Sequence, residues 1–124
     1  MATLGVGVDV VDVPRFTLAL ERHPRLLGRL FTDQERLDAR QRPERLAARF
    51  AAKEAVLKTL HVGIGGAPWR SIEIHRNGDG VPSIELHGAA LELAQRRGVA
   101  HLHVSMTHTP LTAAAFVVGL DERG

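Results

Sequence analysis

The sequence predicts an α+β domain in which a mainly antiparallel sheet packs against one long helix. Two observations carry this prediction. Apolar residues alternate with period two, as in strands, near the start and in the second half of the chain, whereas the region between shows helical spacing. The order of elements (one strand, several helices, two strands, one helix, two strands) is typical of a compact α+β architecture. At 124 residues the chain has the length of one domain, which we assign to residues 1–124.

We expect a buried first strand over residues 4–13. Its two faces differ because side chains alternate along a strand. One face carries Leu4, Val6, Val8 and Val10, and the other carries Gly5, Gly7 and Asp9. The two glycines permit close approach of another group to the face that carries Asp9.

The first helical region follows this strand directly. Asp12 can cap a helix that has Pro14 in its first turn, where the missing N–H costs little. The pair His23-Pro24 interrupts the helical pattern, which resumes through Leu30.

Two more helices are expected before the middle of the chain. Thr32-Asp-Gln-Glu35 is a capping-box pattern that predicts a short helix to about Gln41. Pro43 begins the longest helix, over roughly residues 43–61, and we expect Gly63 to end it.

The second half of the chain contains four strand signals and one helix signal. In order, these are strands at 69–76 and 81–86, a helix at 88–97, and strands at 100–106 and 113–120. Asn77-Gly78 predicts the turn of the first hairpin, and Gly98 closes the helix. Residues 107–112 join the last two strands.

The composition excludes several classes of function. The chain has no cysteine, so disulfides, thiolate chemistry and cysteine-ligated zinc are excluded. A net charge of +2, one Trp and no Tyr disfavour a nucleic-acid-binding domain, because little surface is offered for base stacking. No run approaches 18 apolar residues, and Met1-Ala2-Thr3 lacks a basic-then-apolar leader. We therefore expect a cytoplasmic protein that binds neither nucleic acid nor membrane.

The only two lysines lie five residues apart on the longest predicted helix, whereas arginines number fourteen. Lys53 falls in the middle of an apolar stripe, where snorkelling to the surface or closure of a subunit contact would each give it a structural role, and the sequence leaves this role open. Glu54 and Lys58 lie on the flank beside the small residues Ala47 and Ala51. They form either a solvated i,i+4 ion pair or a pair that faces a ligand in the room that the alanines leave.

Asp9 is an acidic residue within an apolar strand, which is costly unless the carboxylate is paired, hydrogen-bonded or bound to a metal. Asp9 and Glu54 together would supply two carboxylates, a common protein contribution to a Mg²⁺ site that also takes phosphate oxygens. The turn at Ser105–Thr109 carries His108 among hydroxyl residues, and it is either an ordinary turn or a phosphate grip. His101 and His103 share a strand face, but without a third ligand we do not predict a metal site there.

Four segments resemble the holo-acyl-carrier-protein synthases, the small bacterial 4'-phosphopantetheinyl transferases. They are Gly5-Val-Gly-Val-Asp-Val-Val-Asp-Val-Pro-Arg15, Phe31-Thr-Asp-Gln-Glu35, Arg49-Phe-Ala-Ala-Lys-Glu-Ala-Val-Leu-Lys58 and Ser105-Met-Thr-His108. The resemblance covers essentially the whole chain and implies the 4'-phosphopantetheinyl transferase fold. It also implies transfer of phosphopantetheine from coenzyme A to a serine of apo acyl carrier protein in lipid metabolism, with release of adenosine 3',5'-bisphosphate.

The resemblance implies roles for individual residues. Asp9 and Glu54 match the positions that hold Mg²⁺ and so count with Lys58 as catalytic. Lys58 matches the lysine near the diphosphate and is expected to bind coenzyme A there. The general base would be a water or a carboxylate near the metal.

Other matched positions would bind the rest of coenzyme A. Arg49, His108 and Thr109 match positions around the 3'-phosphate, and Pro82 lies where the adenine pocket is lined. The chain departs from the family pattern at residues 110–112, so the resemblance does not define the contacts of Thr109.

The resemblance also implies two protein partners. Arg15, Arg22 and Arg25 are expected to contact the acidic carrier protein, although their segment also fits an ordinary solvated basic face. Pro14 departs from the family pattern beside Arg15. The family forms homotrimers with active sites between subunits, so we expect a homotrimer here. The alternative function is a non-catalytic coenzyme A-binding subunit of the same fold, which the presence of all three catalytic residues disfavours.

Overall fold

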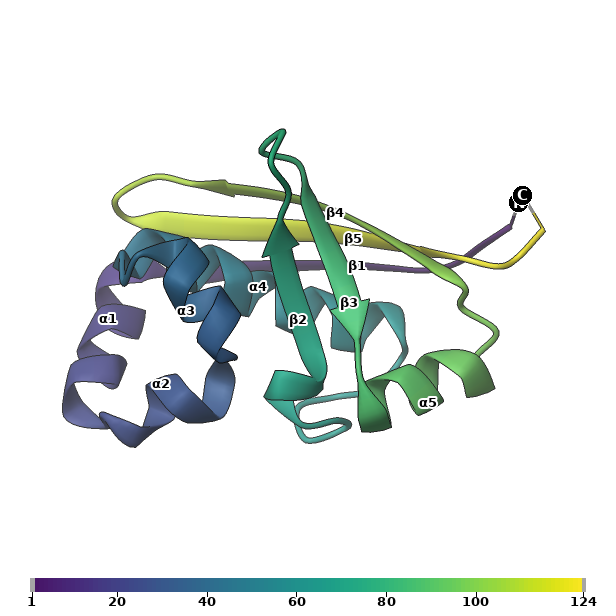
Figure 1. The fold of residues 1–124 in the computed structure, drawn as a ribbon, viewed down its shortest axis with the longest axis horizontal. Helices are drawn as coiled ribbons and strands as arrows, with labels where there is room; N and C mark the ends of the chain where they lie inside the picture. The colour runs from purple at the N-terminus through teal and green to yellow at the C-terminus, as the bar shows by residue number, and fades with distance from the viewer. Residues whose placement is uncertain (1, 124) are drawn as a thin grey trace.

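The computed structural model describes residues 2–123. Gly124 lies outside this range, and so does Met1, the first residue of the segment that lacks a leader pattern. In chain order the elements are β1 (Thr3–Asp12), α1 (Val13–Arg22), α2 (Arg25–Leu30), α3 (Asp33–Ala39), α4 (Pro43–Thr59), the 3₁₀ turn η1 (Trp69–Ser71), β2 (Ile72–Arg76), β3 (Pro82–Leu86), α5 (Gly88–Arg96), β4 (His101–His108) and β5 (Thr112–Leu120). The strands form a three-stranded sheet in the order β1-β5-β4 and a separate β2–β3 hairpin, both antiparallel (Figure 1). The predicted α+β class is confirmed.

Helix α4 lies at the centre of the molecule and packs against both sheets. The close approach that Gly5 and Gly7 permit is that of this helix to β1. A Cβ atom at Gly7 would stand 2.0 Å from the carbonyl oxygen of Ala55, and one at Gly5 would stand 2.2 Å from that of Thr59. Any side chain at either position would push the helix off the sheet.

The long helix does not have the single apolar stripe that the sequence predicted. It is buried on most of its circumference, because β1 and β5 cover one side and the β2–β3 hairpin covers another. Ala47 and Ala51, expected to leave room for a ligand, are completely buried, and the space beside them is filled by protein.

Lys53 forms a buried ion pair with Glu35, and both side chains are completely inaccessible to solvent. The Lys53 Nζ donates to Glu35 Oε1 at 2.8 Å and to the carbonyl oxygens of Trp69 at 2.9 Å and Ile72 at 2.5 Å, which satisfies its three hydrogens. The Ile74 amide in turn donates to Glu35 Oε2 at 3.0 Å. A structural role is therefore correct for Lys53, whereas snorkelling to the surface is wrong.

The predicted helix starts agree closely with the structure. Asp12 accepts a hydrogen bond from the amide of Arg15, and the capping box joins Thr32 and Glu35 in both directions. His23-Pro24 separates α1 from α2 as expected, and Pro43 begins α4.

The predicted helix ends are less accurate. Helix α4 stops before Gly63, because His61 takes the left-handed conformation, with φ of 60°, in a Schellman motif. The amide of Val62 donates to the carbonyl oxygen of Leu57, which closes the motif. Helix α3 likewise ends at Ala39, where Arg40 turns left-handed.

The hairpins differ from the predictions mainly in their bounds. Residues 77–81 form the β2–β3 loop, with Gly80 at φ of 83°, so Asn77-Gly78 does not make a two-residue turn. The last hairpin pairs as expected, but β4 continues to His108. No helix within residues 2–123 is both long and apolar enough to cross a membrane.

The outer face of the three-stranded sheet is apolar and exposed, which corrects the expectation that β1 is a buried strand. Val10 is 64% exposed, and Val6 and Val8 are also exposed. Phe116 of β5 stands directly opposite Val8 on the same face. A solvated face of an antiparallel sheet is ordinarily polar, so this face has the composition of a covered surface.

Candidate functional site

The structure brings Asp9 of β1 and Glu54 of α4 together. The Asp9 side chain is 13% exposed, and its Oδ1 accepts a hydrogen bond from the Lys58 Nζ at 3.1 Å. The same ammonium donates to the carbonyl oxygen of Val8 at 2.9 Å. Thus all three predicted catalytic side chains converge where β1 packs on α4.

The environment of Glu54 favours its protonated form. Burial raises the pKa of Glu54 to about 7, and the negative charge of Asp9 and a hydrogen bond with it act in the same direction. The nearby Lys58 lowers it in part. Two partly desolvated carboxyl groups in contact repel each other when both are ionised, and a cation between them would remove that repulsion.

This pair fits a hard divalent cation such as Mg²⁺. Magnesium takes oxygen ligands, often one or two carboxylates, and fills its remaining positions with water and phosphate oxygens. Within residues 2–123, Asp9 and Glu54 belong to no group of three metal-ligating side chains, so most coordination positions would face outward. Glu54 and Lys58 line a hollow of about 190 Å³ with residues 62–64.

A second hollow, of about 290 Å³, is strongly basic. It is lined by Arg45, Ala48, Arg49, Arg76, Gly80, Pro82, Met106, Thr107 and His108. We call it the basic cleft. Arg45 and Arg49 reach it from α4, whereas Arg76 and Pro82 stand opposite each other on the β2–β3 hairpin.

Arg49 in the basic cleft forms no ion pair with a carboxylate of residues 2–123. It is only 2% exposed, and its Nη1 donates to the carbonyl oxygen of Arg45 at 3.2 Å. Its Nε is buried and is the one side-chain polar atom of this kind in residues 2–123 without a hydrogen-bond partner. Burial lowers the pKa of Arg49, against the opposing influence of Asp38 and Glu35. A buried guanidinium with an unused donor fits a bound anion.

The predicted coenzyme-binding residues therefore divide between the two hollows. Arg49, Pro82 and His108 line the basic cleft, and Lys58 lines the other hollow. Thr109 lines neither, because its hydroxyl accepts hydrogen bonds from the amides of residues 111 and 112 within the turn.

Sequence reasoning missed Arg45 and Arg76 in the basic cleft. Arg45 precedes Arg49 by four residues and so shares its helix face, a signal that was available in the sequence. Arg76 is placed by the hairpin register opposite Pro82, which the sequence alone did not define.

The two hollows lie on opposite faces of α4. Lys58 lies nine residues after Arg49, and Glu54 lies nine residues after Arg45. Nine residues correspond to about two and a half helical turns, which is a half-turn offset and a rise of about 14 Å. Within one chain, the helix itself stands between the carboxylate pair and the basic cleft.

The predicted carrier-binding arginines lie on the surface. Arg15 and Arg22 are exposed on α1, and Arg25 is exposed at the start of α2. None of them forms an ion pair with a carboxylate of residues 2–123, where every ion pair involves lysine or histidine. Their charges are thus available to an acidic partner.

Comparisons with known proteins agree with the fold. A model of the 4'-phosphopantetheinyl transferase superfamily matches residues 5–117. The holo-[acyl-carrier-protein] synthase of Clavibacter sepedonicus is 50% identical over 115 residues, covering 92% of each chain. The solved synthase of Neisseria meningitidis is 30% identical, with a TM-score of 0.87, over 97% of this chain and 100% of that one. The synthase of Helicobacter pylori, solved in complex with coenzyme A, is 27% identical, with a TM-score of 0.84, over 93% and 99%.

The chain therefore belongs to the 4'-phosphopantetheinyl transferase superfamily. Within it, the similarity to holo-[acyl-carrier-protein] synthases extends over almost the entire length. The resemblance found in the sequence and the expectation of a transferase are both confirmed.

Proposed function

We propose that the protein transfers 4'-phosphopantetheine from coenzyme A to a serine of apo acyl carrier protein in a Mg²⁺-dependent reaction. The observation that carries this proposal is the convergence of Asp9, Glu54 and Lys58 where β1 meets α4. The binding of coenzyme A by the Helicobacter pylori relative supports the donor substrate. In the reaction, the serine hydroxyl would give its proton to a water or a carboxylate near the metal, its oxygen would bond to the β-phosphorus, the bond from that phosphorus to the bridging oxygen would break, and adenosine 3',5'-bisphosphate would leave.

The carboxylate pair and Lys58 would act on the diphosphate. A Mg²⁺ ion held by Asp9 and Glu54 would neutralise negative charge on the diphosphate oxygens. The Lys58 side chain is 53% exposed, so its ammonium can turn from Asp9 toward a bound diphosphate. There it would stabilise the charge that develops on the leaving group, which is most of the work in phosphoryl transfer.

The basic cleft would hold the adenosine end of coenzyme A. Arg49 with its unused Nε, together with Arg45, Arg76 and His108, surrounds a space suited to the 3'-phosphate. Pro82 on the hairpin would offer an apolar surface to the adenine. The position of Thr109 in its turn supports Thr107, and not Thr109, as the hydroxyl residue beside the 3'-phosphate.

We also propose a homotrimer in which each site is built from two subunits. The half-turn offset between Lys58 and Arg49 supports this, because one coenzyme A molecule would otherwise have to pass around α4. The exposed valines of β1 supply an apolar face that a second copy could cover. The carboxylate pair of one subunit would then face the basic cleft of its neighbour.

Arg15, Arg22 and Arg25 would dock the acidic carrier. Leu18 is exposed on α1 between Arg15 and Arg22, three and four residues from them, so the three side chains share one helix face. A basic rim around one apolar contact is suited to steering and then holding an acidic protein surface.

The direct test is mass spectrometry of the carrier. Apo acyl carrier protein is incubated with the enzyme, coenzyme A and Mg²⁺, and it should gain the mass of one phosphopantetheine group. Glu54→Gln should abolish this gain, whereas Glu92→Gln, on the exposed face of α5, should not change it. The absence of any gain with every carrier tested, under conditions where the protein is folded, would refute the proposed reaction.

A further inference from the structure

We propose that the outer face of the β2–β3 hairpin is a second metal site, which binds a divalent transition metal ion of the Zn²⁺ class. Its ligands are Glu73, Glu85 and His87, whose ligand atoms all lie within 4.8 Å of one another, with His75 beside both carboxylates as a fourth candidate. These residues are separate from the proposed transferase machinery, and the inference does not depend on the proposed reaction.

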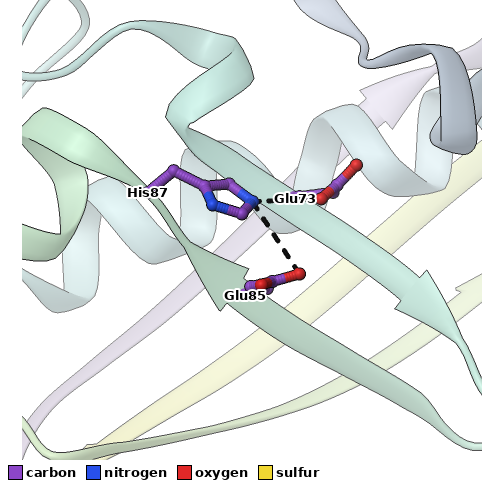
Figure 2. Close-up of side chains that lie close together, drawn as sticks. All are labelled: Glu73, Glu85 and His87. Carbon is purple, nitrogen blue, oxygen red and sulfur yellow. Dashed lines mark hydrogen bonds and ion pairs between the residues drawn. The ribbon is translucent and has the colours of Figure 1, made fainter.

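The hairpin register brings the four side chains together. Glu73 and Glu85 are direct cross-strand partners, and His75 and His87 each lie two residues further along. Figure 2 shows His87 directed at both carboxylates. Two glutamates directly opposite each other repel, and an unfavourable pair of this kind requires compensating positive charge. Two neutral imidazoles with a bound cation would supply it.

The four distances between histidine and carboxylate ligand atoms are near those of a tetrahedral centre. His75 Nε2 lies 2.7 Å from Glu85 Oε1 and 3.2 Å from Glu73 Oε1. His87 Nε2 lies 3.0 Å from Glu73 Oε1 and 3.8 Å from Glu85 Oε1. Ligands about 2.0–2.1 Å from a tetrahedral Zn²⁺ stand about 3.3–3.4 Å apart. The four separations fall within about 0.7 Å of that value, so side-chain adjustments of that size would admit the ion.

A hydrogen bond outside the cluster orients one of the carboxylates. The hydroxyl of Thr32, the N-cap of α3, donates to Glu73 Oε2 and leaves Oε1 directed at the histidines. Hydrogen bonds from neighbouring residues hold metal-ligating carboxylates in this way. Exposure is graded, from 12% for the Glu73 side chain to 56% for Glu85, so an ion can enter from solvent on the Glu85 side.

The ligand set distinguishes this site from the Asp9–Glu54 pair. Imidazole nitrogen favours Zn²⁺, Cu²⁺ or Ni²⁺, whereas an all-oxygen set favours Mg²⁺. His75 and Glu73 point from β2 on the face opposite to Ile72 and Ile74, which are buried in the core. A bound ion would tie the hairpin to the start of α5, where His87 is the N-cap, and through Glu73 to α3.

The test is Zn²⁺ binding to the full-length, metal-stripped protein in the presence of excess Mg²⁺, which occupies the carboxylate pair. Calorimetry should give one Zn²⁺ per chain, with a rise in the unfolding temperature. Substitution by Co²⁺ should give the strong visible absorption of a tetrahedral centre with nitrogen ligands. His87→Gln and His75→Gln should each weaken binding by at least about tenfold, given that loss of an outer hydrogen bond alone costs about 10–100-fold.

His23→Gln is the matched control, because His23 is an exposed histidine at the end of α1, outside the cluster. It should bind Zn²⁺ as the unmodified protein does. Circular dichroism of each variant checks that the fold is retained. Failure of the unmodified protein to bind Zn²⁺ at micromolar concentration, or equal affinity in His87→Gln and His23→Gln, would overturn the proposal. The Co²⁺ spectrum of the unmodified protein provides a readout that needs no variant.

Discussion

Lys53 and Lys58 are five residues apart on one helix, and we predict that their substitutions have opposite consequences. Lys53→Met removes the ammonium that compensates Glu35, leaving a completely buried carboxylate with its charge unpaired. Methionine is similar in length, so little cavity forms and the loss is mainly electrostatic. Removing one partner of a buried ion pair costs about 3–5 kcal/mol. Total stabilities are typically about 5–15 kcal/mol, so much of the native stability would be lost.

Thermal unfolding measures this effect. For a chain of this length, 1 kcal/mol shifts the midpoint by about 4 °C, so Lys53→Met should lower it by about 12–20 °C. All proteins must be compared at one concentration, because association of subunits also raises the midpoint. Lys58→Met is the control for stability. Its partly exposed pair with Asp9 is worth about 0–1 kcal/mol, so the midpoint should hardly move while transfer activity is lost.

A second substitution isolates the charge effect. When Lys53→Met is combined with Glu35→Gln, the unpaired charge is gone, while the side-chain oxygen of the introduced glutamine can still accept from the Ile74 amide. The double variant should therefore be more stable than Lys53→Met alone. A midpoint for Lys53→Met within about 2 °C of the unmodified protein, or an equally large loss in Lys58→Met, would refute the reasoning.

Three other predictions concern the site. The pKa of Glu54 is raised from 4.5 to about 7 in the folded protein. Its protonated form therefore stabilises the fold, and this contribution is fully present below about pH 4.5 and is lost as the pH rises through about 7. Without metal, Glu54→Gln should therefore stabilise more at about pH 8 than at about pH 5.5, and an equal effect at both would contradict the assignment. The Glu54→Gln and Arg49→Met variants should each be inactive alone. When the two are co-expressed, about a quarter of the transfer activity should return, since random assembly of subunits restores one site in four. No recovery would place the site within one chain. Arg22→Glu should raise the KM for the carrier by about tenfold at low salt and leave kcat unchanged, with a smaller effect at high salt; a salt-independent change would count against electrostatic docking.

Helix starts were predictable from the sequence because their signals are local. The capping box at Thr32 and the Asp12 cap each need only residues within one turn. The end of α4 was not predictable from the sequence. His61 adopts a left-handed conformation that glycine usually supplies, and no neighbouring residue marks this position. The bounds of strands and turns were predicted with intermediate accuracy, since the register of the β2–β3 hairpin depends on its five-residue loop.

The partners of buried groups could not be predicted, because they lie far apart in the sequence. Glu35 precedes Lys53 by 18 residues, and its role in the capping box already explained its presence from residues close to it in the sequence. Alternation in β1 identified two distinct faces but did not show which of them α4 covers. The distinction depends on Gly5 and Gly7, whose missing side chains admit the helix. The four side chains of the hairpin cluster were likewise recognisable only once the register was known.

The spacing of charged residues along α4 connects the site to the surface of the sheet. Two cationic groups nine residues apart on a helix cannot face the same ligand, because the helix with its side chains is about 10–12 Å wide. In this molecule β1 and the hairpin also pack against that helix, so a ligand that contacts Lys58 has no short route to Arg49 in the same chain. The same strand that carries Asp9 presents bare valines on its other face. If a second copy covers those valines, its basic cleft supplies what the first carboxylate pair lacks. One surface would then provide both the free energy of association and the completion of the site.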